Sequence, residues 1–411
     1  MLATLIRVRR CDVLVVGAGP AGSVLAAALC RARPELDVLV ADRSVFPRDK
    51  PCGDGISPRA AVLLHGIGAG GVLDGYPPNA ACRIVGPGGE TVRSDGIPSR
   101  QWGVIAGHTI PRTVLDHRLL DFAIGAGAEF WPGARVTGTT LEPGWRTAIV
   151  REGARSVTVR ARLLVGCDGA YSTVRRVLGA GKVPKATTSV AARAYLEWPT
   201  PDSGLRPIRF VFRPGFLPGY GWFFPISPTS ANAGVGLSVA RGRDLHQAVR
   251  EFLAELAAAD RTLDVPAHDL RAHLLPHDRP PLAFRRAALV GDAASMINPL
   301  SGEGIYYALR AGLMLTERLA SVELADAGAL REALRGYEQA FRARFAKHYR
   351  SSRVARRVVS HERLCRAAIA AAAADPRSTE DAVSLLFGDG ATGTPGVARL
   401  LAGAARNAVR R

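Results

Sequence analysis

The sequence lacks paired cysteines and the usual spacings of metal ligands. Its six cysteines are scattered over 411 residues and no C-x-x-C occurs, so we expect reduced thiols in a cytoplasmic protein. The nine histidines include no H-E-x-x-H, and we expect no bound metal. No G-x-S-x-G elbow and no G-K-[ST] loop is present. These absences exclude the common zinc hydrolases, serine hydrolases and P-loop ATPases.

Lysine is also scarce, and arginine carries nearly all the positive charge. Only four of the 54 basic residues are lysine, and the formal net charge is +18. The arginines form no compact run with interleaved aromatics, so we expect no nucleic-acid partner. An uncharged run of 18 residues, 13–30, has the length of a membrane segment but carries three glycines and a proline at its centre. We therefore expect no transmembrane helix.

Short apolar runs alternate with helical patterns in the first half of the chain. Residues 11–19 and 37–43 contain the short, β-branched apolar runs expected of strands buried on both faces of a parallel sheet. A helix between them is expected to end near Pro34. Residues 186–240 instead contain four strand-like segments separated by proline and glycine turns, which indicates antiparallel β structure.

The glycine-rich segment 17–22, GAGPAG, lies where the first strand turns into the first helix. Gly17 permits the tight turn, Gly19 lets the backbone approach a pyrophosphate, and Gly22 allows close contact between helix and strand. The helix N-terminus offers unpaired N–H groups to phosphates. Asp42 follows the second strand, where its carboxylate can accept the hydroxyls of an adenosine ribose.

Two later glycine motifs also follow buried strands. Asp168-Gly169 lies within 166–175, and Gly291-Asp292 is followed by N-P-L-S-G-E-G and a helix. Together with GAGPAG, in this order over residues 11–320, they resemble the flavoprotein monooxygenase-like superfamily. The resemblance implies bound FAD. It places Asp292 at the ribityl chain and the helix N-terminus beside the flavin ring, where negative charge builds on reduction.

Two further segments narrow the resemblance. P-R-D-K-P-C-G-D-G at 47–55 is similar to the P-x-x-K-x-C-G-G-G element of geranylgeranyl reductases, and Y-G-W-F-F-P at 220–225 is similar to their Y-x-W-x-F-P element. The W-x-W-x-I-P element of the related flavin halogenases is absent. Asp54 replaces the middle glycine of the triplet. This departure predicts altered backbone shape and different substrate chemistry.

The predicted fold class is α/β. It comprises a Rossmann-like FAD-binding domain with a parallel sheet, an antiparallel β-sheet substrate domain, and a helical C-terminus. The predicted boundaries are 1–75, 105–185 and 285–330 for the discontinuous FAD-binding domain, 76–104 and 186–284 for the substrate domain, and 331–411 for the C-terminal region.

Each candidate side chain has a functional and a structural interpretation. Cys52 is either an active-site thiol near the flavin, its thiolate favoured by Lys50, or a small residue in a glycine-rich loop. The aromatic residues at 220, 222 and 224 share one strand face, where they form either a cavity wall or part of the core. Arg112 either contacts the pyrophosphate, as the resemblance implies, or is an exposed arginine. Asp168 either contacts the cofactor or stabilises a turn.

The predicted site residues fall into three groups. The catalytic candidates are Cys52, Tyr220 and Trp222. The substrate-binding candidates are Asp54, Tyr220, Trp222 and Phe224. The cofactor-binding candidates are Gly17, Gly19, Pro20, Ala21, Gly22, Asp42, Arg43, Cys52, Gly53, Arg112, Asp168, Gly291, Asp292, Pro299, Gly302 and Gly304.

The function expected from the resemblance is hydride transfer from reduced FAD to a carbon–carbon double bond of a hydrophobic isoprenoid or polyketide-like metabolite. A flavin monooxygenase and a non-catalytic flavin-fold carrier are the alternatives. A second dinucleotide fingerprint is missing, so NAD(P)H or another external reductant would dock transiently. The basic stretch 337–366 is either a solvated helical face or a peripheral membrane contact. The oligomeric state is left open.

Overall fold

The computed structural model describes residues 8–94, 97–99, 103–265 and 270–387. The predicted domains extend beyond these ranges at residues 1–7, 95–96, 100–102, 266–269 and 388–411. Those residues lie outside the described part of the chain. Within the described ranges, no helix has both the length and the apolar character needed to cross a membrane.

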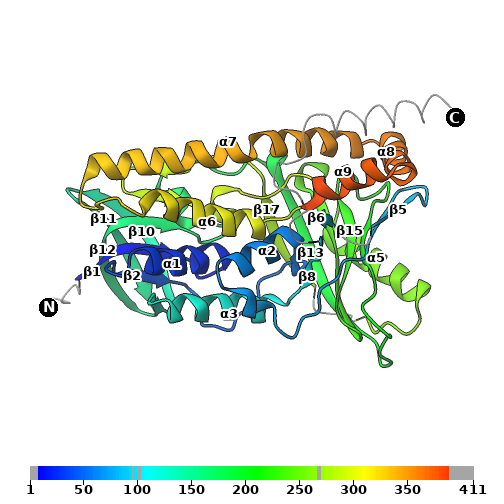
Figure 1. Ribbon diagram of the computed structural model, residues 1–411, viewed down its shortest axis with the longest axis horizontal. Coiled ribbons are helices and arrows are strands. Elements are labelled where there is room, and N and C mark those ends of the chain that lie inside the picture. The colour runs from blue at the N-terminus through cyan, green and yellow to red at the C-terminus, as the bar shows by residue number, and fades with distance from the viewer. Residues whose placement is uncertain (1–7, 95–96, 100–102, 266–269, 388–411) are drawn as a thin grey trace.

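An eight-stranded mixed sheet forms the first layer of the molecule (Figure 1). Five strands run parallel in the order β9-β2-β1-β12-β19, and β10, β11 and β18 pair antiparallel at its margins. Residues 13–16 of β1 and all four residues of β2 are buried, as their apolar runs predicted. The strands are β1 (Val8–Val16), β2 (Val38–Ala41), β9 (Glu129–Trp131), β10 (Ala134–Glu142), β11 (Trp145–Glu152), β12 (Arg155–Gly166), β18 (Ala283–Phe284) and β19 (Ala287–Leu289).

Helices of the same layer pack on this sheet and on one another. Helix α1 begins at a proline, ends two residues before Pro34, and packs between α3 and α6. Its small residues and Gly312 of α6 allow the two helices to approach closely. The helices are α1 (Pro20–Ala32), α2 (Pro58–Gly66), α3 (Arg112–Gly125), α4 (Thr173–Val177) and α6 (Ile305–Leu319).

A seven-stranded sheet forms the second layer, in the order β17-β13-β16-β15-β14-β4-β5. All neighbours are antiparallel except β14 and β4. Helix α5 (Leu245–Ala259) covers part of it by burying Val249 and Phe252. The strands are β4 (Cys82–Val85), β5 (Thr91–Ser94), β13 (Thr188–Glu197), β14 (Ile208–Val211), β15 (Tyr220–Ser227), β16 (Ser230–Ser238) and β17 (Arg271–Pro276). Two small sheets pair β3 (Gly55–Ile56) with β8 (His108–Thr109) and β6 (Ile97–Ser99) with β7 (Gly103–Ile105).

The C-terminal helices bridge the two layers. Helix α7 (Ala327–Val359) runs along most of the molecule in Figure 1, from the first sheet to the end where α8 (Glu362–Ala374) and α9 (Pro376–Phe387) lie. It buries Tyr337 and Phe345 in the core of the first layer, while Leu385 and Leu386 of α9 enter the core beside Phe210 of the second. The predicted α/β fold with a second β sheet and a helical C-terminus is therefore confirmed.

The basic face expected on α7 is partly turned inward. Arg342 donates to the carbonyl of Pro280 and pairs with Glu338, and Arg356 donates to the carbonyl of Pro299. These two arginines thus bind groups of the protein itself. The exposed cations on this half of the helix include Lys347, Arg350 and Arg357.

We predict that these three exposed cations do not bind lipid, because a solvated helical face needs no partner. The variant that replaces Lys347, Arg350 and Arg357 by alanine and the wild type should distribute identically in flotation with anionic vesicles. A salt-sensitive fraction that floats only with the wild type would contradict this and assign the face to membrane contact.

Candidate functional site

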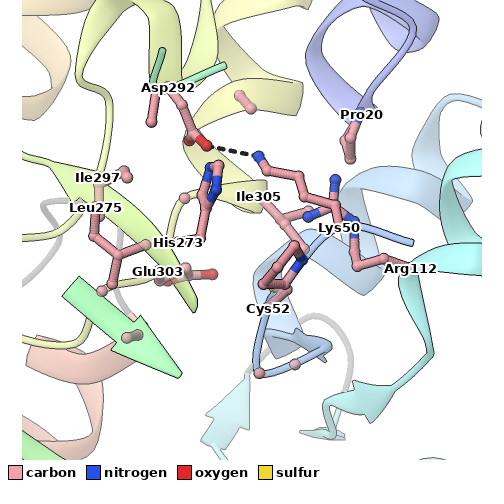
Figure 2. Close-up of a pocket in the computed structure, with 18 of the residues that line it drawn as sticks. Pro20, Lys50, Cys52, Arg112, His273, Leu275, Asp292, Ile297, Glu303 and Ile305 are labelled. Carbon is pink, nitrogen blue, oxygen red and sulfur yellow. Dashed lines mark hydrogen bonds and ion pairs between the residues drawn. The ribbon is translucent and has the colours of Figure 1, made fainter. Parts of the chain in front are cut away.

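One cavity of about 440 Å³ lies between the two sheets, within the size range of small-molecule sites. Its wall contains the turns after β1, β12 and β19, the loop 43–55 and residues of β15 and β17. Figure 2 shows Lys50 of this loop, His273 of β17 and Asp292 of the turn after β19 pointing into the same space. Of the predicted site residues, only Gly22, Gly291 and Asp54 lie outside its lining.

The turn after β1 leaves no room for side chains. Gly17 has φ +105°, and a Cβ added there would lie 2.4 Å from the carbonyl oxygen of Cys167. A Cβ on Gly22 would lie 1.9 Å from the carbonyl oxygen of Gly17. Gly22 is thus required for packing and does not reach the cavity. Gly291 has φ +70° and likewise packs away from the cavity, against Ala21 and Ala308.

Two guanidinium groups stand beside Gly19 at the N-terminus of α1. A Cβ on Gly19 would lie 3.5 Å from Nη2 of Arg48 and 4.0 Å from Nη2 of Arg112. Arg112 is only 3 % exposed, so the interpretation as an ordinary exposed arginine is wrong. It makes a bidentate bond to Asp116 at 2.6 and 2.7 Å, and Arg48 pairs with the same carboxylate at 3.1 Å. The two guanidinium groups share one carboxylate, and α1 has no side-chain cap and no acid in its first turn, so this corner of the cavity carries a net positive charge.

Sequence reasoning missed Arg48, because it occupies a variable position of the cysteine-loop motif. His273 was missed as well. It lies on β17 and lines the cavity near Asp292, and burial together with the charge of Lys50 lowers the pKa of its imidazole to about 4. A single histidine in a strand carries no pattern that would have identified it.

The carboxylates of Asp42 and Asp168 are both held by backbone N–H groups. Asp42 accepts from Ala18 and Ser44, at 2.8 Å each, and remains on the cavity lining with Arg43. Asp168 accepts from the N–H groups of Thr173 and Val174 in the first turn of α4, beside the N-cap residue Ser172. The structure thus supports a turn-stabilising role for the Asp168 side chain. Asp42 holds the turn while facing the cavity.

An ion pair joins the cysteine loop to the turn after β19. Nζ of Lys50 lies 2.8 Å from Oδ2 of Asp292, as Figure 2 shows. Burial alone would raise the pKa of Asp292, but the charge and hydrogen bond of Lys50 outweigh it and hold the pKa below its usual value. The carboxylate next to Gly304 and the start of α6 is therefore ionised at neutral pH.

This ion pair corrects the expectation for Cys52. Lys50 is committed to Asp292, and burial raises the pKa of the Cys52 thiol although the charge of Arg112 opposes the shift. Cys52 lines the cavity as a protonated thiol and not as a thiolate. The five other cysteines are buried away from solvent.

The aromatic residues of β15 line the cavity on one strand face, so they are wall residues and not core alone. The Tyr220 hydroxyl donates to the carbonyl of Ser301, and burial raises its pKa. The Trp222 indole donates to Oδ1 of Asn232 at 2.9 Å. Both polar ends thus bind the protein, and the rings present apolar surface to the cavity together with Phe224. Asp54, predicted to contact substrate, instead lies behind this wall and is 0 % exposed.

The geometry fits a flavin dinucleotide. Glycines that tolerate no Cβ, a positive helix end with two guanidinium groups, and an ionised carboxylate at the start of α6 meet in one cavity. The FAD binding domain family matches residues 10–199. The chain is therefore an FAD-dependent oxidoreductase.

Curated relatives narrow this class. A menaquinone reductase of Mycolicibacterium smegmatis is 35 % identical over 360 residues, covering 85 % of this chain and 84 % of its own. A digeranylgeranylglycerophospholipid reductase of Methanocella arvoryzae is 29 % identical over 317 residues, covering 73 % and 75 %. The chain belongs to the geranylgeranyl reductase family of FAD-dependent oxidoreductases.

Solved structures show the same fold at lower identity. A geranylgeranyl bacteriochlorophyll reductase-like protein of Thermoplasma acidophilum superposes with a TM-score of 0.79 at 20 % identity, with 98 % of both chains covered. A flavin-dependent brominase superposes with a TM-score of 0.69 at 19 % identity, also with 98 % of both chains covered. The fold alone therefore does not choose between reduction and oxygen-dependent chemistry.

We predict that Asp42→Ala weakens FAD retention by about 1.5–3 kcal/mol, the worth of a charge-assisted hydrogen bond. Asp42→Asn keeps the size of the side chain but not its charge, so its affinity for FAD should lie between those of Asp42→Ala and the wild type. Equilibrium dialysis of the released flavin measures the effect. FAD affinity equal to that of the wild type in both variants would contradict the assignment of Asp42 to the ribose.

Proposed function

We propose that this protein reduces carbon–carbon double bonds in the isoprenoid chain of a lipid. The two relatives reported above are named for menaquinone and for a digeranylgeranyl lipid, which differ in their head groups and share a polyprenyl chain. The observation that carries the proposal is the cavity wall, which apolar rings and a protonated thiol line together.

The wall suits an apolar chain. Trp222 and Phe224 turn their rings toward the cavity, and their layer is continued by Phe210, Leu386 and Phe387 from β14 and α9. These rings exclude water, and they hold an alkene in place by burying its apolar surface and not by hydrogen bonds. A polar metabolite would leave this surface without favourable contacts.

Cys52 is the proposed proton donor. Reduced FAD supplies a hydride to one carbon of the double bond when it is bound. The Cys52 S–H gives its proton to the neighbouring carbon, which completes the addition of two hydrogens. Burial keeps the thiol protonated at neutral pH, and the charge of Arg112 stabilises the thiolate that remains until solvent reprotonates it. NAD(P)H or another two-electron donor restores the reduced flavin.

The proposal is tested by anaerobic reoxidation of the reduced holoenzyme. Adding a polyprenyl lipid that has no quinone head group, such as a digeranylgeranylglycerol lipid, without oxygen should restore the absorbance of oxidised flavin, and its fully saturated analogue should not. A quinone ring would itself oxidise the reduced flavin, so menaquinone is not used as the probe. Reoxidation only on admission of air would overturn the proposal and favour a monooxygenase.

We predict that Cys52→Ala lowers the anaerobic rate of double-bond reduction by about 10²–10⁴-fold, the usual contribution of a general acid. Cys52→Ser, which keeps a weaker acid of similar size, should recover part of the rate. FAD content, read from the flavin spectrum, serves as the control and should stay near one per chain. An unchanged rate in Cys52→Ala would assign the proton to another donor.

We predict a different pattern for Trp222→Ala. Removing the ring deletes apolar contact area, so KM for the lipid should rise more than kcat falls. Steady-state kinetics with short and long polyprenyl substrates measures this. A loss confined to kcat would contradict the role of Trp222 as a wall for the substrate chain.

A further inference from the structure

Asp54 interrupts the glycine triplet of the cysteine loop with a carboxylate in the left-handed region of backbone conformation, at φ 62°. Glycine adopts this conformation freely, whereas a side chain there carries a conformational cost. The segment is held by a backbone bond of 2.9 Å from the N–H of Ile110 to the Asp54 carbonyl. A strained and fully buried carboxylate beside the cavity wall requires an explanation.

The Asp54 side chain points away from the cavity into a polar network. Its Oδ2 accepts from the hydroxyl of Tyr195 at 2.7 Å and from Nδ2 of Asn232 at 2.8 Å. Asn232 also donates to the carbonyl of Cys52 at 2.8 Å and accepts from the indole of Trp222 at 2.9 Å. An indole N–H only donates and a peptide carbonyl only accepts, so the orientation of the Asn232 amide is fixed.

This network connects one buried carboxylate to two residues that face the cavity. The cysteine loop and the aromatic strand are packed directly together, since a Cβ on Gly53 would lie 3.2 Å from the ring of Phe224. A small shift of the loop therefore changes the space between the Cys52 thiol and the Trp222 ring. A glycine in place of Asp54, as in the motif that this loop resembles, offers no acceptor to Asn232.

The side chains that affect the pKa of Asp54 come from three elements, β13, β16 and α3. Burial raises the pKa of Asp54 to about 6, while bonds from Tyr195 on β13 and Asn232 on β16 and the charges of Arg112 on α3 and Arg193 on β13 oppose the shift. Above about pH 6 the carboxylate is ionised and its two bonds are charge-assisted. An aspartate in the unfolded chain has a pKa near 3.9 and so loses its proton first. The contribution of Asp54 to the free energy of unfolding therefore falls as the pH rises from about 3.9 to about 6, and it stays constant above that.

We propose that Asp54 is a positioning residue that, through Asn232, sets the position of Cys52 relative to Trp222 on the wall of the substrate cavity. The inference rests on the proposed function, in which these two residues face the substrate. Asp54, which replaces the middle glycine of the motif that this loop resembles, thereby has a defined structural role. A carboxylate that is costly to bury is retained because it locks the wall.

The experiment measures the reactivity of Cys52 in the holoenzyme without substrate. N-ethylmaleimide is added, and alkylation of the peptide that contains Cys52 is followed by mass spectrometry. The other five thiols are buried, so labelling of the native protein reports mainly on Cys52. Asp54→Gly should accelerate labelling about tenfold at pH 7.5, because the loop loses its charge-assisted bonds to the strand.

Asp54→Asn is the matched variant, because it keeps an acceptor oxygen and loses the charge. Its labelling rate relative to the wild type should exceed one at pH 7.5 and approach one at pH 5, where the wild-type carboxylate is itself neutral. The ratio cancels the intrinsic pH dependence of thiol alkylation. FAD content and melting temperature control for unfolding, and Asp54→Asn should melt no lower than the wild type at pH 8.

Three outcomes separate this proposal from the proposed function. A ratio that stays at one at both pH values for both variants overturns the positioning role, whatever the enzyme reduces. Accelerated labelling together with no anaerobic turnover of polyprenyl lipids by the wild type supports the positioning role and overturns the proposed function. Both proposals are supported if the Asp54 variants label faster than the wild type and their KM for the lipid rises by a larger factor than their kcat falls.

Discussion

Parallel pairing of β1, β12 and β19 is the constraint on which the site depends. Parallel strands end at the same edge of a sheet, so the turns that follow these three strands meet although they lie up to about 270 residues apart in the chain. The turns are glycine-rich because a Cβ would collide with backbone, at 2.4 Å for Gly17 and 1.9 Å for Gly22. The wall of the cavity is therefore bare backbone at these turns, and a dinucleotide can approach that backbone closely.

The two ends of this cavity differ in their charge and polarity. Two ion pairs lie at the cofactor end. Asp116 holds Arg112 in place, and Asp292 holds Lys50 in place. At the other end the rings of β15 turn their polar atoms into the protein. The cavity is thus polar and positive at one end and apolar at the other, as a flavin with an isoprenoid substrate requires.

Much of this arrangement is predictable from the sequence, because the motifs are local. The turn at 17–22, the Asp292 turn and the aromatic face of β15 each follow from spacing within one element. The interactions of Lys50, Arg48 and Asp54 are not predictable in this way. Lys50 lies near Cys52 in sequence but pairs with Asp292, and Asp54 turns toward strands β13 and β16, because the tertiary fold decides which side of a loop faces the cavity.

In the proposed reaction the bound flavin delivers its electrons to a carbon–carbon double bond and not to dioxygen. The mass of the lipid product, formed under isotopically labelled dioxygen by the holoenzyme with an external reductant, distinguishes the two fates. We expect a product that has gained two hydrogens for each reduced double bond and contains no labelled oxygen. A product carrying one labelled oxygen atom would rule out double-bond reduction and identify the enzyme as a monooxygenase.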